Sequence, residues 1–144
     1  MINRAFAVAS AALIALLACG SDTPFGSALD ELAVGTWGGE NAGVIVSATA
    51  VHVHVGCTNG DFPGPITFDA DGRFSVAGNY LLRAYPVAIG PTMPARFAGI
   101  IRGRELVMTV AVSDTIAGEL VVLGPVSVRL GKEPELGPCP ICVI

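Results

Sequence analysis

The stretch that decides the fold lies at residues 95–113 and reads ARFAGIIRGRELVMTVAVS. Its second half alternates two sets of residues: Leu106, Met108, Val110 and Val112 in one set, and Val107, Thr109, Ala111 and Ser113 in the other. Period-two alternation places two such sets on opposite faces of a β-strand. Arg102-Gly103 separates this run from an earlier one, and glycine supplies the positive φ that a tight hairpin turn needs. The stretch therefore predicts two antiparallel strands.

Short β-branched runs separated by turn residues continue in both directions from this hairpin. The predicted strands are Val34–Gly39, Gly43–Ala48, Val51–Cys57, Pro65–Phe68, Arg73–Arg83, Ala95–Arg102, Arg104–Ser113 and Gly118–Leu130. The chain has 18 Gly and 10 Pro and only 14% charged residues, which is unfavourable for long helices. We predict an all-β domain, a small antiparallel up-and-down barrel of about eight strands, with a sandwich of the same strands as the alternative.

The predicted connections differ in length and in expected role. Asp69–Gly72 is typical of a tight turn, and its Asp-x-Asp-Gly lacks the further acidic ligands of a calcium loop. Thr58–Gly64 and the proline-rich Pro86–Pro94 are longer, and loops of that kind are where binding usually occurs. Gly124-Pro125 interrupts the last strand, and because proline cannot donate to a ladder we expect a bulge there.

The first eighteen residues have the pattern of a signal peptide. One charge, Arg4, precedes an apolar run from Ala5 to Leu17 that is too short to span a bilayer as a helix, and the small residue Ala18 closes it. Leu16-Leu17-Ala18-Cys19 resembles the lipobox of bacterial lipoproteins, which implies cleavage before Cys19 and lipidation of its thiol. Two or three acyl chains on one cysteine make a lasting membrane anchor.

These features predict the organisation and the address of the chain. We expect a lipoprotein signal peptide at 1–18, the lipidated Cys19 and a flexible tether at 19–33, and the β-domain with its C-terminal tail at 34–144. Gly20 follows the cysteine, where an aspartate would resemble the inner-membrane retention signal of enteric bacteria. The expected location is therefore the cell envelope, with the protein lipid-anchored to the outer membrane on its periplasmic or surface face.

Composition and motif content exclude several classes of function. After loss of Arg4, seven basic residues face twelve acidic ones, a surface unsuited to nucleic acid. The only two histidines are two residues apart on one predicted strand, and the sequence has no Gly-x-Ser-x-Gly motif for a nucleophilic serine. Most acidic residues fall in turns or at strand ends. We therefore expect no catalytic residues, no cofactor and no enzymatic activity.

Two resemblances bear on the fold. Gly35-Thr36-Trp37 resembles the Gly-x-Trp that opens lipocalins and other calycin-like barrels, which implies that Trp37 packs at the barrel base beneath an arginine, here Arg129. The mature domain also resembles a group of short, uncharacterised bacterial lipoproteins, from which no activity can be transferred. The matching segments are Trp37–Glu40, Cys57–Gly60, Asp69–Phe74, Ala95–Gly99, Thr109-Val110 and Cys139.

Three cysteines remain after lipidation of Cys19. In an oxidising compartment two of them can form one disulfide, which leaves the third cysteine without a partner within the chain. The resemblance to the lipoprotein group implies a disulfide between Cys57 and Cys139, with Cys142 as the alternative partner of Cys57. Closing a loop of 82 residues is worth about 4 kcal/mol. Cys139-Pro140-Ile141-Cys142 is also a C-x-x-C, but a redox site of that type needs a following helix, and we expect a structural role.

His52 and His54 lie on one face of a predicted strand, where two imidazoles can share a metal ion. A solvated surface pair is the simpler interpretation, so a metal site at His52 and His54 is only a third hypothesis. The leading hypothesis is a barrel that binds a small apolar ligand inside or at its mouth, with Ala48, Gly78, Gly99 and Ala111 as small inward residues beside Phe74, Tyr80 and Phe97. The alternative is a structural or protein-interaction module of the envelope, with outward apolar residues such as Leu81, Ile100 and Val107 in one patch.

Overall fold

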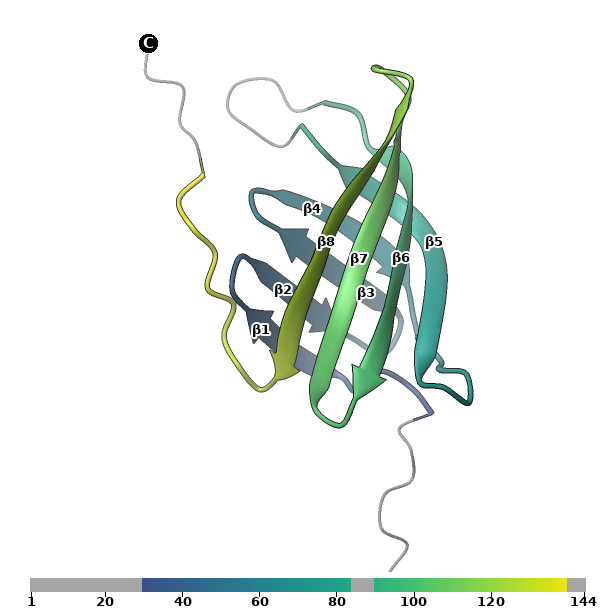
Figure 1. The fold of residues 1–144 in the computed structure, drawn as a ribbon, viewed down its shortest axis with the longest axis vertical. Helices are drawn as coiled ribbons and strands as arrows, with labels where there is room; N and C mark the ends of the chain where they lie inside the picture. Colours follow the sequence, from purple (N-terminus) through teal and green to yellow (C-terminus); the bar gives the residue numbers. More distant parts are fainter. Residues whose placement is uncertain (1–29, 84–89, 140–144) are drawn as a thin grey trace, which may run out of the picture.

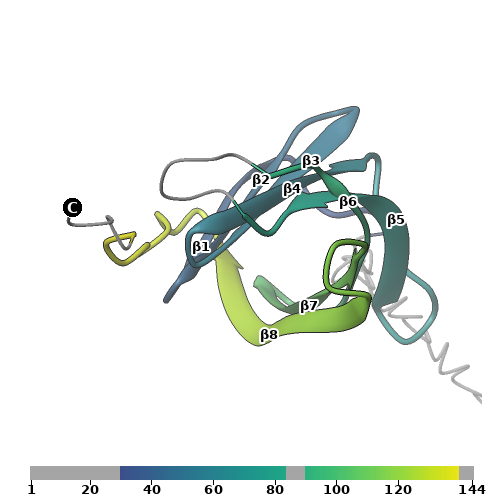
Figure 2. The ribbon, with the colours of Figure 1, turned by 90° about the horizontal axis from the view of Figure 1, so that it is seen from above.

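Eight antiparallel strands form the described part of this computed structural model, which comprises residues 30–83 and 90–139. They are β1 (Gly35–Gly39), β2 (Ala42–Val46), β3 (Ala50–Val55), β4 (Thr58–Pro63), β5 (Arg73–Leu81), β6 (Met93–Arg102), β7 (Glu105–Asp114) and β8 (Glu119–Leu130). Each strand pairs with the next, and β8 pairs with β1 to close a barrel (Figures 1 and 2). The prediction of an all-β up-and-down barrel is confirmed, and the alternative of a sandwich is wrong. No helix long and apolar enough to cross a membrane occurs in residues 30–83 and 90–139.

The fourth strand lies elsewhere than predicted. Residues 58–63 form β4, where the sequence indicated a long loop, and Gly56-Cys57 makes the tight turn before it, with Gly56 at φ 59°. The predicted strand Pro65–Phe68 contributes only an isolated bridge between Thr67 and Glu31. The polar residues Asn59 and Asp61 indicated a loop, but they belong to a strand and point outward from the barrel, beside the histidines of β3.

Alternation along the strands separates core from surface, as predicted for β3 and β7. On β3 the valines at 51, 53 and 55 are buried while His52 and His54 are partly exposed, and on β7 the even-numbered set is buried. The largest fully buried side chains all point into the barrel: Trp37, Tyr80, Phe62, Phe97, Met93, Leu106 and Met108. Burial of these apolar side chains is the main stabilising contribution to the fold.

Three inward glycines leave space for aromatic rings to pack directly against the backbone inside the barrel. A Cβ on Gly78 would lie 2.5 Å from the Phe62 ring, and one on Gly99 would lie 2.9 Å from the Phe74 ring. A Cβ on Gly60 would collide with the Tyr80 ring. Inward positions for Gly78 and Gly99 match the prediction, but the space beside them holds the protein's own rings. The prediction is wrong for Ala48, which is exposed between β2 and β3, and for Ala111, which lies on the outward side of β7.

The C-terminal tail straps the closing seam of the barrel. β1 and β8 share only two residue pairs, Trp37 with Leu130 and Gly38 with Arg129. Residues 131–135 then run along β1, where the amide of Glu135 donates to the carbonyl of Gly39 over 2.9 Å and the amide of Asn41 donates back to Glu135 over 2.9 Å. A Cβ on Gly38 would collide with the backbone of residues 132–133. Gly38 therefore makes room for this tail, whereas Gly39 makes room for Ser127 and Val128 of β8.

Other predicted features fall close to their expected places. In β8, Gly124-Pro125 stands opposite the single residue Thr109 and produces the predicted bulge. Gly103-Arg104 turns β6 into β7, and Asp69–Gly72 forms the predicted tight turn, in which the Asp69 carboxylate accepts bonds from the amides of Asp71 and Arg73 at 2.9 and 2.8 Å.

The predicted tether is too long at its C-terminal end. Leu32 is buried, and its amide donates to the carbonyl of Ile66 over 2.8 Å, so the domain already includes residues 30–33. Leu32 follows the charged residues Asp30 and Glu31, and so short a segment carries no periodicity, which explains why the sequence pattern missed it. The predicted signal peptide, its cleavage site and Cys19 lie outside the described residues.

Candidate functional site

The interior of the barrel is occupied by the side chains of the protein itself. Trp37, Tyr80 and Phe97 have no exposed surface. The ring of Phe97 contacts those of Phe62 and Phe74, with centroids 5.2 and 4.8 Å apart. In the described residues every buried side-chain nitrogen or oxygen has a hydrogen-bond partner. Eight strands enclose a space that side chains can just fill, and the packing here follows that rule.

One wall of the barrel presents an outer surface of small and apolar side chains, which we call the β5–β8 face. Its members are Ser75, Ala77, Pro94, Arg96, Ala98, Ile100, Val107, Thr109, Ala111, Ser113, Leu120 and Val122. Leu120 and Val122 are 66% and 58% exposed, so large apolar side chains stand in solvent beside much smaller neighbours. Of the predicted outward residues, Ile100 and Val107 pair on this face, whereas Leu81 pairs with Asn59 of β4, away from it.

Two hollows lie on this wall because small side chains form its floor. The larger, of about 740 Å³, is bordered by outward residues of β5, β6 and β7, including Ile100 and Val107, and by residues 67–69. The smaller, of about 400 Å³, has Ala77, Ala111 and Ser113 at its floor and Leu120 beside it. Both are open surface hollows that a protruding side chain of another molecule can enter.

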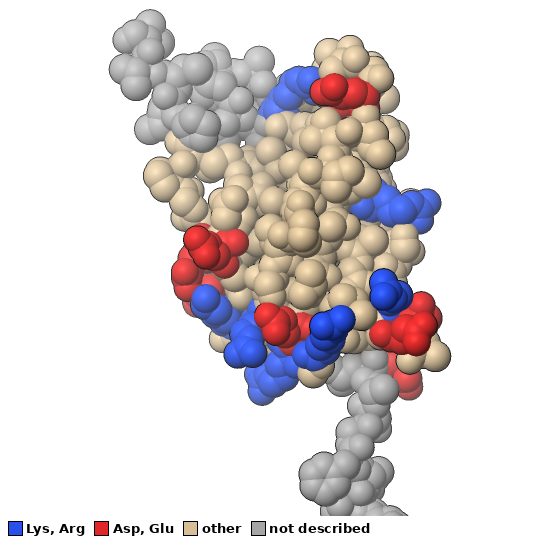
Figure 3. All heavy atoms as spheres, in the orientation of Figure 1, with Lys and Arg blue, Asp and Glu red and all other residues tan. Residues whose placement is uncertain are grey.

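Charge is almost absent from the β5–β8 face. Arg96 is its only charged member, and its guanidinium donates to the hydroxyl of Ser75 over 3.1 Å. Figure 3 shows charged side chains of both signs collected near the end of the barrel at which the described chain begins, while the middle of the visible wall is uncharged. Depletion of charge is a feature of the centres of protein interfaces.

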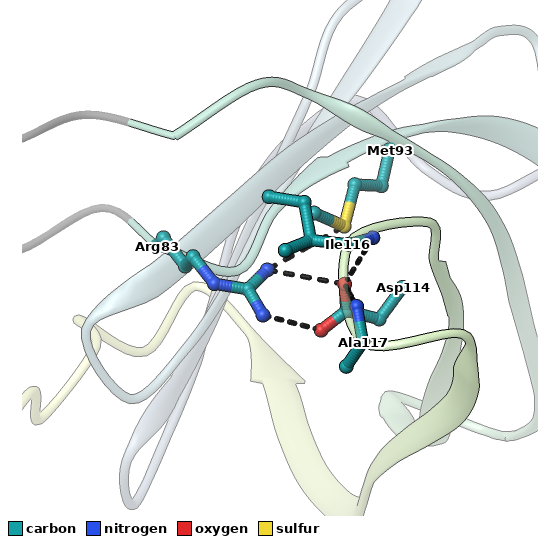
Figure 4. A network of polar contacts seen from close by, with 5 residues as sticks. All are labelled: Arg83, Met93, Asp114, Ile116 and Ala117. Atoms are coloured by element: carbon teal, nitrogen blue, oxygen red, sulfur yellow. Dashed lines mark hydrogen bonds and ion pairs between the residues drawn. The ribbon is translucent and has the colours of Figure 1, made fainter.

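An ion pair fastens the opposite end of the barrel (Figure 4). The Arg83 guanidinium donates to both oxygens of Asp114, at 3.2 and 2.6 Å, and the amides of Ile116 and Ala117 donate to the same carboxylate at 2.9 and 3.0 Å. These donors, led by Arg83, lower the pKa of Asp114 to about 2. The pair joins the end of β5 to the β7–β8 turn. The predicted binding loop Pro86–Pro94 begins just beyond it, and its residues 86–89 lie outside the described part.

A second polar cluster lies on the outer side of β3 and β4. The Nδ1 atom of His52 is 2.7 Å from the Asp61 carboxylate, and its Nε2 atom is 2.9 Å from the Nε2 atom of His54. With the carboxylate accepting from Nδ1–H, the Nε2 atom of neutral His52 accepts the Nε2–H of His54. Burial lowers the pKa of His54, and the positive charge that His52 would carry in its protonated form lowers it further. The described residues contain no group of three or more His, Cys, Asp or Glu side chains arranged around one metal position.

The remaining predicted site residues have separate structural roles. Cys57 and Cys139 form the predicted disulfide, which ties the tail to the turn between β3 and β4, while Cys142 lies outside the described residues. Trp37 is fully buried, and its indole Nε1 donates to the carbonyl of Ala33 over 3.0 Å. Arg129 is exposed on β8, where it follows the inward Val128 and pairs with Gly38, the residue after Trp37. The packing of Arg129 over Trp37 that the lipocalin resemblance implies stays a prediction.

Comparison of the chain with family models, with curated proteins and with solved structures found no match to any of the three.

Proposed function

We propose that this protein is a non-enzymatic, lipid-anchored interaction module of the bacterial cell envelope, which docks a partner protein on its β5–β8 face. The observation that carries the proposal is that face itself, where Leu120 and Val122 are exposed and two hollows open. Arg96 is the charge in the middle of the face, and Asp69 and Arg73 lie at the edge of the larger hollow. A wall that only faced water would carry the dispersed charges of an ordinary soluble surface. The filled interior favours this function over the binding of a small apolar ligand inside the barrel.

A protein partner fits this face better than a lipid surface does. Segments that lie on anionic membranes combine apolar residues with several lysines and arginines. The β5–β8 face offers only Arg96, whose guanidinium already bonds to Ser75, and Arg73 at its edge, which borders the larger hollow together with the acidic Asp69. Because residues such as Ala98 and Ala111 are small, they form the floors of hollows into which the larger side chains of a partner can pack.

The anchor gives this module its place. Lipidation of Cys19 would hold the barrel at a membrane surface, and the sequence favours the outer membrane. Residues 20–29 separate the cysteine from the first described residues, and the flexible tether predicted there from composition would allow the domain to turn its β5–β8 face towards a partner in the envelope.

Photo-crosslinking in living cells tests the proposal. A photoreactive amino acid at Ala98 or at Leu120 is expected to give an adduct with the same envelope protein, because the two positions border different hollows of one face. The same amino acid at Ile45, an exposed apolar position on β2, serves as the matched control and is expected to give no such adduct. Val122→Glu should abolish the adduct from Ala98, while Ile45→Glu should leave it intact.

Two outcomes would contradict the proposal. Equal adducts from Ile45 and from the β5–β8 face would show that the crosslinks are not specific to this face. Adducts with lipid alone would show that the face contacts a membrane and not a protein. The anchor is tested on the same cells by fractionation. Cys19→Ser is expected to move the protein out of the membrane fraction, and its retention there would contradict lipid anchoring through Cys19.

A further inference from the structure

We propose that His52 and His54 form a binding site for a divalent transition metal ion of the copper(II) class, with the Asp61 carboxylate orienting His52. This site lies on β3 and β4, apart from the β5–β8 face, and it does not depend on the proposed docking function. Both histidines project from the outer side of the barrel, where the His52 side chain is 36% exposed and open to an ion from solvent.

The two imidazoles converge on one point. Their Nε2 atoms are 2.9 Å apart and the rings lie nearly edge to face, with centroids 4.7 Å apart and an angle of 71° between their planes. Histidines at positions i and i+2 of a strand share one face, but solvated side chains would normally point apart. Here Asp61 on the neighbouring strand holds His52, so one half of the pair is fixed before any ion arrives.

The bond to Asp61 selects the nitrogen that remains for a metal. A metal-ligating histidine commonly donates its other ring N–H to a carboxylate, which fixes the tautomer and raises the basicity of the ligating nitrogen. The Nδ1 atom of His52 has such a partner at 2.7 Å, so its Nε2 atom carries the lone pair. A metal ion would replace the proton now shared between the two Nε2 atoms, and the displaced proton would go to solvent.

The ligand type indicates the kind of metal. The 2.9 Å between the Nε2 atoms is the length of their hydrogen bond, and it shows that both imidazoles can reach one ion. Imidazole nitrogens are ligands for copper(II), nickel(II) and zinc(II). With no third protein ligand among the described residues, water would complete the coordination. Copper(II) stands at the top of the affinity order for such ligands.

Titration with copper(II) chloride alone tests the site. The protein is the untagged chain Gly20–Ile144, which keeps every strand, with Cys142→Ser to remove a competing thiol. Calorimetry is expected to show one strong copper(II) site per chain, bound more tightly than zinc(II), and electron paramagnetic resonance is expected to show nitrogen coordination. His52→Gln and His54→Gln should each abolish this site. Asp61→Asn should weaken it about 10–100-fold, the effect typical of losing such a supporting carboxylate.

The matched control is Asp71→Asn, which removes an equally negative charge from an exposed turn and should leave the affinity unchanged. All of these positions point outward, so circular dichroism should show the same fold for each variant. Copper(II) binding that survives His54→Gln would overturn the site, and unchanged affinity in Asp61→Asn would overturn the role of the carboxylate. Zinc(II) bound as tightly as copper(II) would contradict the assignment of metal class.

Discussion

Trp37→Ala is expected to lower the free energy of unfolding by about 3–5 kcal/mol, the usual effect of truncating a large buried aromatic residue. Trp37 is fully buried on β1, and its ring stands where β1 meets β8 through only two residue pairs. Its indole nitrogen also donates to the carbonyl of Ala33, which connects the entering chain to the barrel. Truncation would remove core volume and a hydrogen bond at the weakest seam of the sheet.

Chemical denaturation followed by far-ultraviolet circular dichroism measures this effect. Fluorescence is unsuitable because Trp37 is the only tryptophan of the chain. Val34→Ala, three residues away at a position that is 67% exposed, is the control and should change stability by less than about 0.5 kcal/mol. A Trp37→Ala protein as stable as the control would show that the closing seam does not depend on this ring.

Removal of the disulfide is expected to lower the free energy of unfolding by about 4 kcal/mol, because it closes 82 residues and restricts the unfolded chain. The bond also holds the tail, which runs along β1 and lies over Gly38 and Gly43. The measurement starts from Cys142→Ser, which prevents Cys142 from replacing the lost partner. Adding Cys139→Ser to that background should produce the full loss.

Reduction provides an independent control on the pairing. The Cys142→Ser protein treated with a reductant should become as unstable as the protein that also carries Cys139→Ser, and the doubly substituted protein should not respond. If Cys142→Ser alone caused the loss and Cys139→Ser caused none, the bond of Cys57 would be with Cys142.

The fold was predictable from the sequence because apolar and polar residues alternate along several of the strands. Leu106, Met108 and Val110 are recognised as one set of β7, separate from Val107 and Thr109, without any knowledge of the neighbouring strands. The fourth strand was not predictable, because Asn59-Gly60-Asp61 has the composition of a turn. Gly60 lacks the Cβ that would collide with the Tyr80 ring. Because the two residues are far apart in the chain, the residues next to Gly60 do not reveal this contact.

That error also hid part of the candidate metal site. His52 and His54 were recognised from their spacing, but their partner Asp61 was assigned to a loop, and only the register of β3 with β4 places it opposite His52. The ion pair of Arg83 with Asp114 was missed for a similar reason, since 31 residues separate the two. The alternation of β7 separated Val107 and Thr109 from the other set, but the choice of the inward face needed the closed barrel.

Side chains fill the barrel, and we therefore propose that the protein acts through its outer surface. A comparison of the native with the denatured mass spectrum of the chain Gly20–Ile144, purified from an oxidising periplasm and treated with a chelator, tests this proposal. Both spectra should show the mass of the polypeptide less two hydrogens for its disulfide. Extra mass that is present in the native spectrum and released on denaturation would reveal a ligand held by the barrel and would contradict a function of the outer surface alone.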